Sequence, residues 1–499
     1  MTADPGINLT VLDWMVLVIY ASSMLFIGWY YSKKNVNQED YLLGGRKMNP
    51  TAVGISLFAS LLSTLSYLSY PGEMIQHGPA IFAGVLAFPV VYYVAGWWLI
   101  PKIMQMQVTS AYEILEVKLG LSIRMLATVM FLSLRLLWMA TIIYVTVDVA
   151  LFSVIQFDRS YVPFLTVILT IITIVYTSMG GLKAVVLTDV IQTCIFMGGA
   201  LLSIIVVSYH LGSFTEIFPS SWPQHWDEFR IGFDPLERTT IGNAMLALFT
   251  WYICTTGSDQ IAIQRYLSTK DIATARRSFR ISLYSTVLAY ILLALVGLAM
   301  VAYFSENMEL LNLDADLQSQ ADTLFPRFVI IALPTGISGL IIAGLLAAAM
   351  SSMSSGLNSV SSVISEDIIK RFFSKENSQG HVLKQVQTLS YLTGLMVIVL
   401  SFFIGVVSGN LFDVIMKVVN LFVAPLFVLF FMALFIPFAT ERATFAAGIF
   451  SILFAVAVAF YGLFGITVLW IMPSSLVAGI FVGVILSLFD RKKIATYNL

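Results

Sequence analysis

The sequence predicts an all-α membrane protein with about thirteen transmembrane helices. The 499-residue chain is 59% hydrophobic and only 11% charged, whereas about a quarter of the residues of an average soluble domain are charged. A water-soluble enzyme of this size would need more charge on its surface. The formal net charge of −1 provides no basic footprint for a nucleic acid. We therefore expect the lipid bilayer to be the protein's solvent.

Thirteen segments are apolar enough to cross the hydrocarbon core, which takes about 20 helical residues. In chain order they are 10–31, 49–72, 80–103, 122–153, 161–178, 185–209, 240–258, 276–304, 324–366, 384–407, 412–437, 443–462 and 467–489. The first is long for a signal peptide and lacks a small-residue cleavage site, so we interpret it as a helix.

The basic residues are divided unequally between the two sets of loops that these spans would create. One set carries 21 of the 27 Lys and Arg residues and the other carries four, while Arg135 and Lys417 lie inside spans. Cytoplasmic loops are the ones enriched in Lys and Arg. The sequence therefore predicts a plasma-membrane protein with its N-terminus outside and its C-terminus in the cytoplasm.

Polar residues interrupt two of the predicted spans. Segment 49–72 contains GISLFASLLSTLSYLSYPG, and segment 240–258 ends in the run LFTWYICTTGSDQ. Irregular backbone at membrane depth is tolerated where it lines a cavity. Two broken helices at corresponding positions of two five-helix halves are typical of an inverted-repeat transporter. The alternative is that these hydroxyls only hydrogen-bond within packed helices.

Segment 324–366 has the richest polar pattern, in the run AAAMSSMSSGLNSVSS. Four of its residues share one helical face, namely Ala348, Ser351, Ser352 and Ser355. Ser354 lies beside this face. Hydroxyl and carbonyl oxygens suit a small, hard, monovalent cation, whereas a divalent ion would need several carboxylates. A packing face of small residues is the competing interpretation.

An aspartate lies near a predicted membrane face, in the run TSMGGLKAVVLTDVIQ. Gly180 and Gly181 allow a tight turn there, and Asp189 follows at the start of segment 185–209. Two interpretations remain open for this carboxylate. It is either a solvated residue stabilised by the helix dipole, or an anionic ligand for a cation on the inner side of segment 324–366.

Three runs together resemble the strongest signatures of the sodium:solute symporter family, whose members include sugar, iodide, vitamin, proline and sialic-acid transporters. These runs are GGLKAVVLTDVIQ, DQIAIQRYLS and AAAMSSMSSGLNSVSS. The resemblance implies one transporter domain over residues 1–499, with a LeuT-like core of five plus five helices. The repeats would be 49–209 and 240–437, with 10–31 and 443–489 peripheral.

The resemblance also implies sodium-binding residues at the matching positions. The family's common site corresponds here to backbone carbonyls and two hydroxyls, from Ala59, Leu62, Ala348, Ser351 and Ser352. Some members are similar in having a second sodium site, and its positions here are Asp189, Ser351, Ser354 and Ser355. We therefore expect sodium as the coupling ion, with one or two ions in each cycle.

The substrate cavity is expected at mid-membrane. Its expected residues are Ser63, Ser66, Ile81, Val85, Arg135, Trp138, Thr255 and Thr256. Leu61, Val85 and Trp138 stand where sugar- or sialic-acid-transporting relatives often have polar side chains. This difference argues against a polyhydroxylated substrate.

Arg135 is costly inside a membrane and needs a partner. It either holds the carboxylate of a small organic anion, such as a monocarboxylate, or has a structural role, in an ion pair or by snorkelling toward the cytoplasm. Asp259 and Arg265, at the two ends of DQIAIQR, are candidates for an inner gate that breaks when the cavity opens inward.

These features predict a sodium-coupled symporter that imports a small organic solute by alternating access. The chain has no H-E-x-x-H or G-x-S-x-G motif, so we do not expect an enzyme. A sodium-conducting channel and a transporter-like sensor are the alternatives. The expected assembly is a monomer or a weak homodimer.

Overall fold

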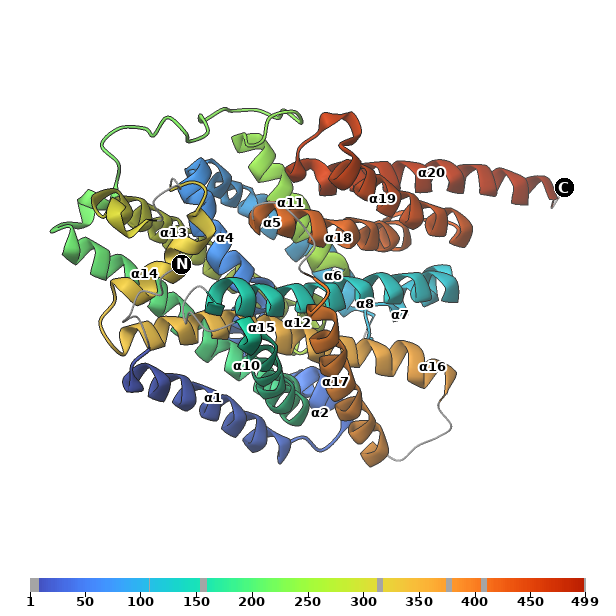
Figure 1. Ribbon diagram of the computed structural model, residues 1–499. Helices are drawn as coiled ribbons and strands as arrows, with labels where there is room; N and C mark the ends of the chain where they lie inside the picture. Colours follow the sequence, from blue (N-terminus) through green and yellow to red (C-terminus); the bar gives the residue numbers. More distant parts are fainter. Residues whose placement is uncertain are drawn as a thin grey trace.

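A computed structural model describes residues 9–106, 108–152, 159–311, 317–373, 379–404 and 411–497 (Figure 1). These residues form helices joined by loops, and none of them lies in a strand. The longer helices are α1 (Val11–Ser32), α3 (Pro50–Leu61), α4 (Thr64–His77), α8 (Leu121–Tyr144), α10 (Val162–His210), α11 (Ile241–Ser258), α13 (Ile272–Glu306), α14 (Ala321–Ile331), α15 (Ile337–Val363), α17 (Gln379–Ser401), α18 (Leu411–Phe435), α19 (Glu441–Tyr461) and α20 (Ile471–Tyr497). The shorter ones that bear on the sites are η2 (Pro79–Ala87), α5 (Phe88–Val94), α7 (Glu113–Leu119), α12 (Gln260–Leu267), η8 (Ile364–Ile369) and η10 (Val468–Trp470).

The helices confirm a multi-pass membrane protein. Within the described ranges, nine helices are long and apolar enough to span a bilayer, or ten if the bent pair α3–α4 is one span. In this number α10 counts once, although it contains both predicted segments 161–178 and 185–209. Gly181, with φ 62° and ψ −163°, breaks α10 between those two segments. The total of thirteen spans therefore stays a prediction.

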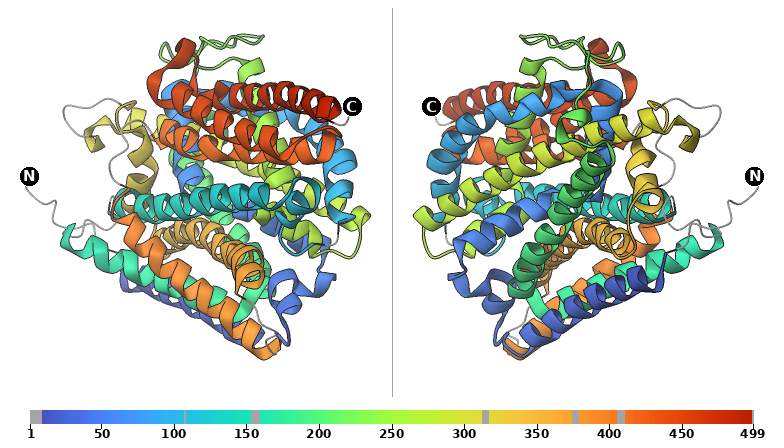
Figure 2. Two further views of the ribbon diagram at one scale, coloured as in Figure 1. Left: turned by 90° about the vertical axis from the view of Figure 1, so that its right-hand side faces the viewer. Right: turned by 90° about the vertical axis from the view of Figure 1, so that its left-hand side faces the viewer.

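The packing places α15 in the middle of the bundle. In its most apolar part, 83% of the residues are buried, against 22% for α1. Helix α10 packs against both α15 and α1, while α18, α19 and α20 pack together. Figure 2 shows α1 at one side of the bundle and α19 and α20 at the opposite side. The polar residues of α15 are thus surrounded by protein rather than lipid.

Both predicted helix breaks occur. Between α3 and α4, Leu62 and Ser63 adopt extended backbone conformations, and the two helices meet at a bend of 68°. Between α11 and α12, Asp259 is extended, with φ −84° and ψ 126°. A break leaves the last carbonyls of the preceding helix without intrahelical partners. Each break therefore places free backbone oxygens inside the bundle.

The prediction of one continuous helix over 324–366 is wrong. The structure divides this segment into α14 and α15, because Pro334 and Gly336 (φ 86°) lie between them. The start of α15 is capped from α1, where the Asp13 carboxylate accepts from the backbone N–H groups of Gly336 and Gly339, both at 2.8 Å. The first helix is thereby tied to the helix that carries the predicted cation residues.

Candidate cation and solute sites

The oxygens predicted for the first sodium site converge where α15 passes the end of α3. The Ser351 hydroxyl donates to the carbonyls of Ala59 (3.0 Å) and Ala348 (3.1 Å). The Ser352 hydroxyl donates to the Leu62 carbonyl at 2.9 Å. All five residues are buried. The structure therefore brings together residues that are almost 300 positions apart in the chain, with separations of 292 and 290.

The chemistry of this oxygen cluster fits a monovalent cation. Its members are neutral carbonyl and hydroxyl oxygens, the ligand type that small, hard cations prefer. The break after α3 supplies the carbonyls of Ala59 and Leu62, because those groups have no partner further along their own helix. In a bound state the two serine hydroxyls would turn their lone pairs toward the ion instead of donating to the carbonyls.

Asp189 lies on α10 close to this cluster, and it is completely buried. One of its carboxylate oxygens accepts from the hydroxyl of Ser56 (2.5 Å) and from the guanidinium of Arg265 (3.3 Å). The same guanidinium nitrogen donates to the Ser355 hydroxyl at 2.6 Å, and that hydroxyl lies 2.7 Å from the Ser60 hydroxyl. The interpretation of Asp189 as a solvated helix-start residue is therefore wrong.

The other residues expected at the second site are arranged differently. Ser354 donates to the Ser351 carbonyl at 3.0 Å, and Ser351 belongs to the first cluster. The second carboxylate oxygen of Asp189 has no hydrogen-bond partner among the described residues. Ser56 and Ser60, which contact Asp189, were not expected there; their i, i+4 spacing on α3 was the available signal.

The two gate candidates do not pair with each other. Arg135 of α8 forms a buried ion pair with Asp259, and Arg265 pairs with Asp189. The Asp259 carboxylate also accepts from the backbone N–H of Ile261 at 2.8 Å and so caps α12. Both ends of the short helix α12 are therefore attached to neighbouring helices through buried charges.

A cavity with a volume of about 120 Å³ lies between the broken helices and α8, α13 and α18. Five of the expected residues line it: Ser66, Ile81, Arg135, Trp138 and Thr255. Three others do not appear in its wall: Ser63, Val85 and Thr256. Ser63 and Thr256 are buried elsewhere in the bundle, and Val85 packs against the hydrophobic core.

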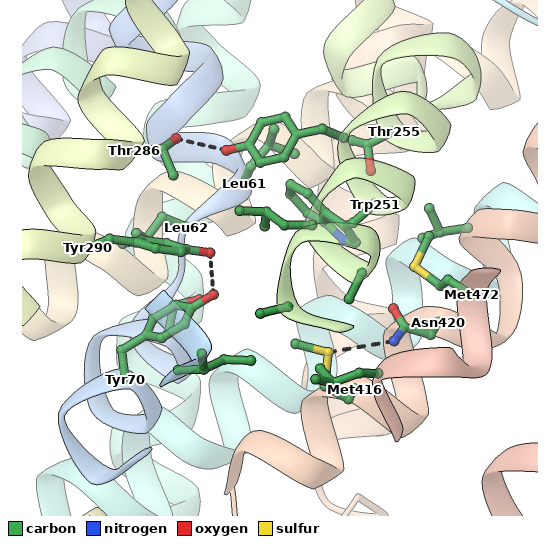
Figure 3. Close-up of a pocket in the computed structure, with 18 of the residues that line it drawn as sticks. Leu61, Leu62, Tyr70, Trp251, Thr255, Thr286, Tyr290, Met416, Asn420 and Met472 are labelled. Atoms are coloured by element: carbon green, nitrogen blue, oxygen red, sulfur yellow. Dashed lines mark hydrogen bonds between the residues drawn. The ribbon is translucent and has the colours of Figure 1, made fainter. Parts of the chain in front are cut away.

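Several residues of the cavity wall were not predicted (Figure 3). The hydroxyls of Tyr70 and Tyr290, which lie side by side in the wall, are hydrogen-bonded to each other. Trp251 and the amide of Asn420 also face it, and a lone Asn in the apolar segment 412–437 was the signal for the latter. Met472 of α20 lines the cavity too, so segment 443–489, expected to be peripheral, contributes a residue to the cavity wall.

Two polar groups of the wall are left without partners. Among the described residues, neither the Arg135 Nε–H nor the Thr255 hydroxyl has a hydrogen-bond partner. Buried polar groups are normally satisfied, because an unsatisfied one costs about 1–3 kcal/mol. The described residues thus leave hydrogen-bonding capacity unfilled in the side chains of the cavity wall.

A multi-pass helical bundle with two broken helices, a buried oxygen cluster and a central cavity defines an ion-coupled transporter. The chain belongs to the sodium:solute symporter family, whose family model matches residues 41–451.

Relatives and solved structures agree with this membership. The sodium/sialic acid symporter SiaT of Proteus mirabilis is 28% identical over 468 residues, which are 90% of each chain. The sodium-coupled monocarboxylate transporter 1 of Mus musculus is 29% identical over 438 residues, which are 85% of this chain and 69% of the mouse protein. A solved structure of a sodium-coupled sialic acid symporter, in a substrate-bound outward-open state with a novel sodium site, superposes with a TM-score of 0.84 at 26% identity, covering 96% of this chain and 98% of that one.

A more distant structure shows the shared fold alone. The nucleobase-cation-symport-1 family transporter Mhp1, in its inward-facing conformation, superposes with a TM-score of 0.57 at 12% identity, covering 90% of this chain and 92% of that one. This protein is thus an all-α, LeuT-like symporter that couples sodium to a small organic solute by alternating access. It is a transporter and not an enzyme.

Proposed function

We propose that the solute is a small organic anion, a monocarboxylate or a molecule of similar size, and that it is imported with sodium. The observation that carries this proposal is the guanidinium of Arg135 in the cavity wall, with its Nε–H unpartnered among the described residues. Guanidinium groups bind carboxylates through paired N–H donors. Two of the relatives are named for acids, sialic acid and monocarboxylates.

The size and lining of the cavity favour a small and partly apolar solute. Its volume of about 120 Å³ is below the roughly 150 Å³ of an engineered cavity that holds benzene. Leu61, Trp138 and Met472 supply apolar wall. The small volume supports a compact anion over a larger polyhydroxylated molecule.

We further propose two sodium positions. The first would use the carbonyls of Ala59, Leu62 and Ala348 with the hydroxyls of Ser351 and Ser352, as their convergence supports. The second would be built around the free carboxylate oxygen of Asp189, with Ser355 beside it. One or two ions would then move with each solute.

Sodium would drive import through its site between α3 and α15. Each ion entering across a potential of 100 mV contributes about 2.3 kcal/mol, besides its concentration gradient. A bound ion would hold the broken end of α3 against α15 and so order the cavity wall next to it. Solute then binds better, and by thermodynamic reciprocity sodium does too. Movement of α12, which carries the inner-gate candidate Arg265 and is capped by the other candidate, Asp259, would open the cytoplasmic side.

The same proposal includes the arrangement in the membrane. The repeats would be 49–209 and 240–437, flanked by 10–31 and by 443–489, and parts of both repeats lie outside the described residues. The protein would reside in the plasma membrane with its N-terminus outside and its C-terminus in the cytoplasm, because most Lys and Arg residues fall in one set of loops. A monomer or a weak homodimer is the proposed assembly.

A thermal-shift screen of the purified protein tests the substrate class. Propionate and lactate would be compared with their neutral amides and with glucose, each with sodium and with potassium. We expect the carboxylates to raise the melting temperature only in sodium. Stabilisation by glucose without stabilisation by any carboxylate would refute the proposed class.

A further inference from the structure

We infer that Asp259 is a built-in competitor for the carboxylate of the substrate, and that substrate binding at Arg135 displaces Asp259 and releases α12. This inference rests on the proposed function, because it requires an anionic solute. It assigns Asp259 as a positioning residue that acts through Arg135 and α12.

The position of Asp259 supports this role. It is the single residue between α11 and α12, and its two carboxylate oxygens have different partners. One engages the Arg135 guanidinium, and the other accepts from the Ile261 N–H at 2.8 Å. Asp259 and Arg135 are only 2% and 6% exposed. A charge buried this far needs a counter-charge, so in the absence of substrate Asp259 provides one for Arg135.

The Arg135 guanidinium has enough N–H donors to bind a second carboxylate, but its single positive charge balances only one. A guanidinium carries five N–H groups, and the Nε–H of Arg135 is free of partners among the described residues. Two carboxylates on one buried guanidinium would leave a negative charge uncompensated, which is strongly unfavourable. A substrate carboxylate that takes Arg135 therefore weakens its attachment to Asp259.

The other end of α12 connects this exchange to the cation sites. Arg265, in the last turn of this eight-residue helix, donates to Asp189 at 3.3 Å and to Ser355 at 2.6 Å. Its guanidinium thus occupies part of the proposed second sodium position. Release of α12 at Asp259 removes one of its two charged attachments and lets Arg265 withdraw from Asp189. Substrate and sodium would then favour each other's binding.

The size of the effect follows from competition. If the Arg135–Asp259 ion pair is formed in about 99% of molecules, it raises the apparent Kd of a competing anionic ligand about 100-fold. If the ion pair is formed in about 90% of molecules, it raises that Kd about tenfold. Removal of the Asp259 charge should lower the Kd of an anionic ligand by a factor in this range. A neutral ligand of the same shape should be unaffected.

The test uses the purified full-length chain and propionate, with propionamide as the uncharged match. Binding would be measured by tryptophan fluorescence, since Trp138 and Trp251 line the cavity. The variants are Asp259→Asn and Asp259→Ser, because both replacements still cap a helix. Glu73→Gln is the matched control: that buried carboxylate pairs with Arg238 at 2.6 Å, away from the cavity wall.

We expect both Asp259 variants to bind propionate about tenfold or more tightly than the unmodified protein, with less dependence on sodium. Their KM for uptake should fall because the solute binds more tightly. Their kcat should also fall, because the variants have no ion pair at Arg135 whose breaking would couple solute binding to the release of α12. Propionamide binding should not change, and Glu73→Gln should leave the propionate Kd within about twofold.

Two results would overturn the inference in distinguishable ways. If the Asp259 variants bind propionate no more tightly, while the double variant Arg135→Gln/Asp259→Asn loses binding, the anionic substrate class stands and the competitor role is wrong. If the unmodified protein responds to neither propionate nor lactate, the proposed substrate class fails and the inference fails with it. If Asp259 had only a structural role, its replacement would lower the melting temperature of the protein without raising the affinity for propionate.

Discussion

Ser352→Ala is the sharpest perturbation of the proposed sodium site. The Ser352 hydroxyl is one of five oxygens in the cluster, and it donates to the Leu62 carbonyl at 2.9 Å. A hydrogen bond or dipole contact to a charged partner contributes about 1.5–3 kcal/mol. At about 1.4 kcal/mol for each factor of ten, the variant should need about 10- to 100-fold more sodium for half-maximal transport.

Uptake into proteoliposomes at varied external sodium measures this change. The control is Ser361→Ala on the same helix, because Ser361 is also buried but donates to the carbonyl of Leu357, one turn earlier (2.6 Å). We expect that variant to shift the sodium requirement less than about twofold. An equal shift in the two variants would refute the assignment of Ser352 to the sodium site.

Three further predictions concern the second sodium site, the break in α10 and the ion pair between Glu116 and Arg124. Asp189→Asn should lower the measured stoichiometry from two sodium ions per solute to one; an unchanged ratio would exclude the second site. Gly181→Ala should destabilise the fold by at least about 1–3 kcal/mol in thermal denaturation, because its backbone conformation strongly favours glycine, whereas Gly198→Ala, with open space around it, should not. The hydrogen bond from Arg124 (2.5 Å) holds the pKa of Glu116 below its ordinary value of 4.5. The stability that this ion pair contributes is therefore present above pH 4.5 and is lost as the pH falls below that value. Between pH 6 and pH 3, the melting temperature should fall more steeply for the unmodified protein than for Glu116→Gln.

The fold class, the helix breaks and the polar face of α15 could be predicted because local pattern encodes them. Apolar length identifies membrane helices, and polar interruptions in 49–72 and 240–258 mark where those helices break. The i, i+3, i+4 spacing of Ala348, Ser351 and Ser352 places their oxygens on one face. Each of these signals lies within a few turns of a single helix, so the sequence carries it directly.

The partners of the buried arginines could not be predicted, because they join distant helices. Arg135 meets Asp259 across 124 positions of the chain, and Arg265 meets Asp189 across 76. Periodicity says which face of a helix is polar, but not which helix that face meets. Their positions at the two ends of DQIAIQR led us to expect Asp259 and Arg265 as an inner gate, and the packing places them in two separate ion pairs.

The cavity shows the same limit. Tyr290 and Met472 line it, yet an aromatic residue and a methionine in apolar helices look like ordinary core or lipid-facing residues in the sequence. Asn420 differs, because a lone amide in an apolar segment indicates a buried polar contact. Three-dimensional packing was needed to see that α13, α18 and α20 meet at one cavity.

The ratio of sodium flux to solute flux tests the central claim most directly. Proteoliposomes would be given an inward sodium gradient, and labelled sodium and labelled propionate or lactate would be followed together. Symport by alternating access predicts a fixed ratio of one or two sodium ions per solute and little sodium entry without solute. A sodium flux that is equally large without any solute would contradict the account and indicate a channel.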